Sequence, residues 1–148
     1  MNTNNMERPL GMVIGRLINS MLRVINARTT QQTETKLTID QFGLLYAIFQ
    51  KEEEVIQKDM AEIMHKDTSS ILRMIDSLES KELVRRVVNA NDRRKNHLIV
   101  TEKGEKAIES HLKVEKTVND DLLEGLTKED MDTFYKVLHH IQRKSEMM

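Results

Sequence analysis

The amino-acid sequence predicts a mainly helical fold with one small β-hairpin, built as a single domain over residues 1–148. Aromatic residues make up only 3% of the chain and Trp is absent, so the apolar set is mostly Leu, Ile, Val and ten Met. This mixture favours a helical core over a β-sandwich. Apolar residues recur every three or four positions through most of the chain, and this helical period gives way to a β-like pattern once, between residues 83 and 100.

The first predicted helix has a broad apolar face between residues 10 and 25. Its apolar positions follow one another at alternating steps of three and four, which is the pattern of an amphipathic helix. Such a face near a chain end packs either on a partner subunit or on the core of its own chain, and the spacing does not decide between them. The apolar positions are Leu10, Val13, Ile14, Leu17, Ile18, Met21, Leu22 and Ile25.

Two further helices are predicted from capping boxes. Thr38 stands at a predicted N-cap, and Gln41 follows at the third helical position. The same arrangement recurs at Thr127, with an Asp at the third helical position. We therefore expect helices at about 38–50 and 127–146.

Residues 55–81 are predicted to form two short helices joined by a tight turn. An apolar cluster marks the first helix, and the polar residues after His65 interrupt it. Asp67 is a candidate N-cap for the second helix, which runs from Thr68 to about Ser80.

The β-like pattern predicts a hairpin with a long polar tip. Residues 83–88 and 97–100 are rich in β-forming side chains, and the segment between them, 89–96, is polar and charged. Thr101 is then placed to cap a further helix that continues toward Leu122.

The helix from Thr68 presents a polar face that could contact DNA. At about 100° per residue, Ser69, Ser70 and Arg73 lie opposite its apolar side. Small hydroxyl side chains permit close approach to a phosphate or a base edge, and Arg can donate two hydrogen bonds to guanine. Free amides at a helix N-terminus also favour an anion. A solvated face is the commoner meaning of such residues, so this helix alone is a weak signal.

The hairpin carries a local excess of positive charge. Between Arg85 and Lys103 there are six basic and two acidic residues, in a chain whose net charge is −1. Asp92 beside Arg93 and Arg94 at the tip suits an oriented guanidinium that enters a narrow, electronegative minor groove. The competing interpretation is a hairpin whose charges only prevent pairing between sheet edges.

Several short motifs between residues 55 and 104 follow one another in a specific order. They are Asp-Met-Ala-Glu-Ile at 59–63, Ser-Ser-Ile-Leu-Arg at 69–73, Leu-Glu-Ser-Lys-Glu-Leu-Val-Arg-Arg at 78–86, Asp-Arg-Arg at 92–94, and Leu-Ile-Val-Thr at 98–101 followed by Gly104. The combination resembles the MarR family (multiple antibiotic resistance regulators), although no single motif is specific. The order of helices on either side also agrees.

The resemblance implies a homodimer of winged helix-turn-helix subunits. Residues at about 36–104 would form the DNA-binding lobe, and helices at about 9–35 and 105–146 from both subunits would form a dimerisation region. Such a dimer would bind a palindromic operator in double-stranded DNA. Many members are repressors released by a small ligand, so a small-molecule effector is a possible further partner.

The resemblance also assigns residues to the two grooves of DNA. The recognition helix would enter the major groove, and the wing tip would reach the minor groove with Arg94 inserted and Asp92 bracing it. The expected DNA-binding residues are Thr68, Ser69, Ser70, Arg73, Asp92, Arg93, Arg94 and Lys95.

Two positions depart from the family pattern. Members often have Gly in the helix-turn-helix joint, where this chain has His65, and Gly after the recognition helix, where it has Glu82. His is among the non-Gly residues enriched at positive φ, so we expect the turn to survive at some cost. With Glu82 in place of glycine, the sequence does not predict at which residue the recognition helix ends.

Other classes of function find little support in the sequence. The chain has no Cys, which excludes disulfides, thiolate catalysis and Cys-ligated zinc. It has no Gly-rich phosphate loop and no nucleophile elbow, so we expect neither an enzyme nor a cofactor. No apolar run approaches the roughly 18 residues of a membrane span, and the polar start does not resemble a signal peptide. We therefore expect a cytoplasmic protein without a membrane partner.

Two alternatives to a sequence-specific repressor remain open. Five histidines raise the possibility of a metal-responsive regulator, although no two of them have the i and i+4 spacing that zinc sites on helices use, and we assign no metal ligands. Winged helices also serve as protein–protein adaptors. An adaptor would not need an arginine pair braced by Asp at the wing tip.

Overall fold

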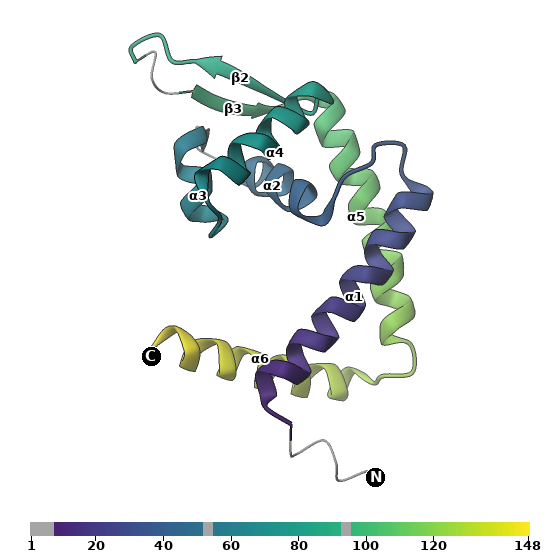
Figure 1. The fold of residues 1–148 in the computed structure, drawn as a ribbon. Helices are drawn as coiled ribbons and strands as arrows, with labels where there is room; N and C mark the ends of the chain where they lie inside the picture. Colours follow the sequence, from purple (N-terminus) through teal and green to yellow (C-terminus); the bar gives the residue numbers. More distant parts are fainter. Residues whose placement is uncertain (1–7, 52–54, 93–95) are drawn as a thin grey trace. The chain divides into compact units, whose positions relative to one another are not determined.

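The computed structural model describes residues 8–51, 55–92 and 96–148 (Figure 1). The chain divides into two compact units, Met1–Lys116 and Thr117–Met148. Helix α5 (Glu102–Leu123) contributes to both of them. The described residues are mostly helical and include one small antiparallel sheet, which confirms the predicted fold class.

The helices and strands follow the predicted order, with one addition. The strands are β1 (Val55–Ile56), β2 (Val84–Val88) and β3 (Asn96–Val100). None of the helices in the described ranges has the length and apolar character needed to cross a bilayer. The remaining helical elements are α1 (Leu10–Gln32), α2 (Ile39–Phe49), the 3-10 turn η2 (Gln57–Asp59), α3 (Met60–Ile63), α4 (Thr68–Ser80) and α6 (Lys128–Glu146).

The predicted helix starts are confirmed by their hydrogen bonds. The hydroxyl of Thr38 accepts from the amide of Gln41 at 3.1 Å, and the Gln41 side chain accepts from the amide of Thr38 at 3.1 Å. Thr127 and Asp130 form the equivalent pair at the start of α6, at 3.1 and 2.9 Å. At the start of α5, the hydroxyl of Thr101 accepts from the amide of the third helical residue at 3.0 Å. Each of these contacts is local, so the sequence sufficed to predict it.

The sheet corrects one prediction. Residues 55–81 were expected to form two short helices joined by a tight turn, with no strand, but Val55–Ile56 form β1, which pairs antiparallel with β3. The strand order is β1-β3-β2, and Leu98 of β3 lies opposite both Val55 of β1 and Arg86 of β2. A strand of two residues has no periodicity of its own, and its partner lies far along the chain. The sequence pattern therefore could not reveal it.

The core of the first unit lies beneath α4. Ile71, Ile75 and Leu78 are at most 1% exposed and form the inner side of this helix. They pack in one cluster with side chains from α2, α3, the sheet and α5, among them Leu44, Leu45, Met60, Leu83, Val84, Leu98 and Ile108. Because the inner side of α4 is held by this cluster, its opposite side is kept at the surface.

Two residues with positive φ flank α4. His65, in the joint between α3 and α4, has φ 51°, and Glu82, between α4 and β2, has φ 60°. These are the two positions where glycine was expected from the family pattern. Only a few per cent of non-glycine residues adopt this left-handed conformation, and His is among those that do so more readily. The helix-turn-helix joint therefore keeps its geometry without glycine.

Gly104, in the first turn of α5, lies where a side chain has no room. The carbonyl oxygen of Leu83 accepts a hydrogen bond from the amide of Thr101 at 3.0 Å, which holds the start of α5 against the residue that precedes β2. A Cβ atom at Gly104 would lie 2.2 Å from that oxygen and 2.8 Å from Cγ1 of Val100. Backbone atoms cannot move aside as a flexible side chain can, so the Thr-x-x-Gly motif has a steric reason.

We expect Gly104→Ala to lower the free energy of unfolding by roughly 1–3 kcal/mol, the usual cost of overpacking. The matched control is Gly43→Ala in α2, where the nearest atom to a new Cβ is the terminal methyl of Met64 at an ordinary 3.6 Å. This control should be neutral or stabilising by up to about 1 kcal/mol, because Ala is the better helix former. Urea unfolding followed by circular dichroism measures both. Equal stability of Gly104→Ala and wild type would contradict the steric argument.

Candidate nucleic-acid interface

The N-terminus of α4 is closed by an acidic cap. One carboxylate oxygen of Asp67 accepts from the amide of Ser70 at 2.9 Å, and the other accepts from the Ser70 hydroxyl at 2.6 Å. These bonds hold the pKa of Asp67 below its ordinary value, the hydroxyl bond being the largest cause. The predicted N-cap is thereby confirmed. The expectation of free amides that attract a phosphate is wrong at Ser70, because a carboxylate already occupies that position.

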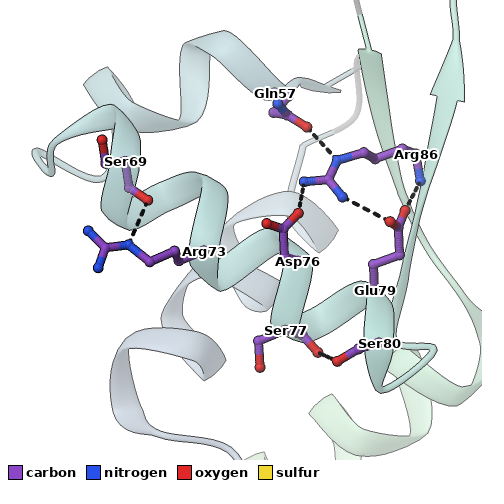
Figure 2. A network of polar contacts seen from close by, with 8 residues as sticks. All are labelled: Gln57, Ser69, Arg73, Asp76, Ser77, Glu79, Ser80 and Arg86. Atoms are coloured by element: carbon purple, nitrogen blue, oxygen red, sulfur yellow. Dashed lines mark hydrogen bonds and ion pairs between the residues drawn. The ribbon is translucent and has the colours of Figure 1, made fainter.

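The first half of α4 presents Ser69 and Arg73 at the surface. Both residues are exposed, as is Thr68 at the first helical position. The Nε atom of Arg73 donates to the main-chain oxygen of Ser69 at 3.3 Å, and Figure 2 shows the side chain running back along the helix with its guanidinium directed away from the ribbon. The terminal nitrogens of Arg73 thus lie at the exposed surface, as a donor pair for a base edge requires.

The second half of α4 carries polar side chains that interact within the lobe. Ser77 accepts a hydrogen bond from the side-chain amide of Gln41 at 3.0 Å, which ties α4 to α2. The Ser80 hydroxyl donates to the main-chain oxygen of Ser77 at 2.8 Å. The hydroxyl groups of both serines are therefore engaged by residues of α2 and α4.

Arg86 of β2 makes a polar network that the sequence did not reveal (Figure 2). Its guanidinium donates to Asp76 at 2.5 Å and to Glu79 at 2.8 Å, both on α4, and its Nε donates to Gln57 of η2 at 2.6 Å. Its main-chain amide donates to the second oxygen of Glu79 at 3.1 Å. Burial alone would lower the pKa of Arg86, but the hydrogen bonds and charges of Asp76 and Glu79 outweigh it and raise the pKa. We call these four side chains the Arg86 clamp.

The wing turns back on an asparagine at the end of β2. The Asn89 side-chain oxygen accepts from the amides of Asn91 and Asp92 at 2.8 and 3.2 Å. This Asx-type turn sets the direction in which the chain enters the tip. The three predicted tip residues Arg93, Arg94 and Lys95 lie outside the described residues, so their roles and the bracing of Arg94 by Asp92 stay predictions.

The histidines bear on the metal-responsive alternative. Over residues 8–51, 55–92 and 96–148, no three His, Cys, Asp or Glu side chains gather as metal ligands would. His97 is 8% exposed, and its Nε2 lies 2.9 Å from the side-chain nitrogen of Asn89. His111 is 3% exposed and stacks on Phe42 with 3.8 Å between the ring centroids. Burial lowers the pKa of His111, so the fold favours its neutral form.

Comparison with known proteins finds similarity to MarR, in part of the sequence and in the fold. The family model for MarR matches residues 37–95. A crystal structure of MarR is 26% identical over 100% of this chain and 96% of its own, with a TM-score of 0.79. The C80S mutant of MarR from E. coli, crystallised with operator DNA, is 23% identical over 95% and 99% of the two chains, with a TM-score of 0.76. CouR from Rhodococcus jostii RHA1, bound to p-coumaroyl-CoA, is 21% identical over 90% and 91%, with a TM-score of 0.71.

The buried His111 predicts a loss of stability in acid. Its pKa is lower in the folded chain than its unfolded value of about 6.5, so its contribution is complete above that pH and falls as the pH drops toward the folded pKa. The slope contributed by one such group reaches at most about 1.4 kcal/mol per pH unit.

We expect His111→Leu to remove this part of the pH dependence, and His140→Leu, at an exposed site on α6, to leave it unchanged. Urea unfolding of the three proteins at pH values from about 7.5 to 5 measures the difference. Parallel pH profiles for wild type and His111→Leu would show that His111 does not titrate on unfolding.

Proposed function

We propose that this chain, which is similar to the MarR family of winged-helix, DNA-binding transcription regulators, is a repressor that binds a palindromic operator as a homodimer. The observation that carries the proposal is the division of α4 into a buried side, held by Ile71, Ile75 and Leu78, and an exposed side with Ser69 and Arg73 at its first turns. A helix held in this way can enter the major groove as a rigid body.

We propose that Arg73 reads base edges and that Thr68, Ser69 and Ser70 contact DNA beside it, with Ser69 and Ser70 near the bases. The exposed guanidinium supports the role of Arg73, because bidentate contact of Arg with guanine is the commonest specific contact in the major groove. The Asp67 carboxylate at the helix start opposes close approach of a phosphate there. Ser70, whose hydroxyl already donates to that carboxylate, can still accept a hydrogen bond from a base.

We propose that the wing tip enters the minor groove, with Arg94 inserted, Arg93 and Lys95 near the phosphates, and Asp92 bracing Arg94. The three consecutive basic residues 93–95 beside a single Asp92 support this assignment, since the chain as a whole carries a net charge of −1. Narrow A/T-rich minor grooves have an enhanced negative potential that attracts arginine. The wing would therefore sense groove shape, whereas α4 would sense base identity.

Exposed apolar side chains on two helices support a dimer. A two-fold dimer presents two recognition helices to two half-sites about one helical turn apart, which explains a palindromic operator. Burial of these side chains against a second copy would be favourable by about 25 cal/mol per Å². They are Leu10, Leu17 and Ile18 on α1, and Phe134, Tyr135, Val137 and Leu138 on α6.

We propose that an effector, where one binds, acts by changing the separation of the two recognition helices. The p-coumaroyl-CoA bound to CouR supports small-molecule binding on this fold. A ligand shifts a conformational equilibrium only to the extent that it binds one state more tightly than the other. The effector's binding site would thus differ between the DNA-bound and the released forms.

Arg73 and Arg94 should have separable effects on DNA binding. Arg73→Ala should cost roughly 1–3 kcal/mol and relax sequence preference at one position in each half-site. Arg94→Ala should weaken binding most at operators with A/T-rich flanks and should lower the salt dependence of binding. Asp92→Ala should show part of the same effect, because a guanidinium without its bracing carboxylate must be ordered on binding. Titrations of one selected operator and a flank-swapped version at two salt concentrations measure these effects.

The flank-swapped operator serves as the internal control, since the base contacts of α4 are the same in both. If Arg94→Ala binds both operators as wild type does, the wing does not read the groove, and the adaptor interpretation becomes the better one.

We expect the protein to sediment at twice its chain mass of 17.3 kDa at micromolar concentration. Phe134→Glu, which places a charge at an exposed apolar site on α6, should weaken the dimer by roughly 2 kcal/mol or more, the cost of losing a central apolar contact. Lys136→Glu, at an exposed polar position of the same helix, should leave it unchanged. A wild-type monomer that still binds the operator tightly would disprove the dimer.

A further inference from the structure

The Arg86 clamp joins three elements that the proposed function uses together. Arg86 lies on β2 at the base of the wing, Asp76 and Glu79 lie on α4, and Gln57 lies on η2 just ahead of α3. Four separate donor atoms of one arginine are engaged, at distances from 2.5 to 3.1 Å (Figure 2). The rigid, planar guanidinium fixes the directions of the three side-chain bonds, which the point charge of Lys cannot do.

Two features distinguish this network from an ordinary surface ion pair. The Arg86 side chain is only 21% exposed, so water and salt screen it less than they screen a fully exposed charge. Glu79 also binds the main-chain amide of Arg86 as well as its guanidinium, so the contact holds the strand itself and not only a side chain. Because Asp76 and Glu79 are three positions apart on α4, both carboxylates face β2 together.

The charges of the clamp are unfavourable for DNA binding considered alone. The Asp76 side chain is 65% exposed and lies one turn after Arg73 on the helix proposed to enter the major groove. A carboxylate at that position repels phosphates. Electrostatic attraction to DNA alone would disfavour a carboxylate at this site. The contact of Asp76 with Arg86 supplies the reason for its presence.

We propose that Arg86 is a positioning residue for DNA binding: through Asp76, Glu79 and Gln57 it holds the wing at a fixed place relative to α4, so that major-groove and minor-groove contacts form as one unit. This inference rests on the proposed function, in which α4 and the wing occupy neighbouring grooves. In that arrangement the wing is already ordered when the chain has folded, so little conformational entropy is lost when it binds DNA. The flank preference of the wing therefore depends on residues that do not touch DNA.

The test uses Asp76→Asn and Glu79→Gln, which keep side-chain shape and remove one negative charge each. If these acids act only through charge, both variants bind DNA more tightly and keep the wild-type preference for A/T-rich flanks. If the clamp positions the wing, the flank preference falls by about fivefold or more, the lower end of a typical coupling between sites. Arg86→Lys, which can still reach one carboxylate, should lie between wild type and Arg86→Gln.

A second measurement reports wing placement without DNA. The chain has no Cys, so Ser69→Cys on α4 and Asn91→Cys on the wing introduce the only two thiols for spin labels. Labelled chains are diluted into excess unlabelled protein before distances are measured by pulsed electron paramagnetic resonance. We expect one narrow distance distribution in the wild-type background and a broad one with Asp76→Asn, Glu79→Gln or Arg86→Gln.

Arg85→Gln is the matched control, because this neighbour is exposed on the same strand and its loss removes the same charge. It should leave both the distance distribution and the flank preference unchanged, and circular dichroism checks that every variant is folded. Narrow distributions in all clamp variants, or tighter binding with an intact flank preference, would overturn the proposal. Absence of DNA binding by the wild type would overturn the proposed function instead, while the label distances would still test the clamp.

Discussion

The lobe formed by α2, α3, α4 and the sheet depends on burial of one side of α4. Ile71, Ile75 and Leu78 are fixed in a core built from α2, α3, the sheet and the start of α5. Three buried aliphatic side chains of this size contribute several kcal/mol through loss of water contact alone. That burial sets the rotation of the helix, and the rotation places Ser69 and Arg73 at the surface. The spacing of the apolar residues along α4 therefore decides which of its polar side chains are exposed.

The parts of the fold that the sequence predicted are those fixed by neighbours along the chain. The capping residues Thr38, Asp67 and Thr127 each bind an amide three positions later, and such contacts are readable from a short window. Strand β1 was missed because its two residues gain strand character only by pairing with β3. The positive φ at His65 was expected from the family pattern and not from propensity.

The same distinction applies to the candidate site. Helical projection sufficed to place Ser69 and Arg73 at the surface, because exposure there follows from the local period. It gave no indication that Ser77 contacts Gln41, or that Arg86 contacts η2 and α4, since these pairs meet only once the lobe has folded. Charge counting treated Arg86 as part of a basic patch, whereas its charge is matched by two carboxylates within the lobe.

The two left-handed residues at the ends of α4 limit how this segment can change during evolution. His65 and Glu82 reverse the backbone before and after a helix of 13 residues, so the number of residues between the reversals is set by the geometry of the lobe. An insertion or deletion within α4 would turn the rest of the helix by about 100° and carry Arg73 or the buried aliphatic side chains to the wrong side. Relatives that recognise different operators are then expected to differ here by substitution at constant length.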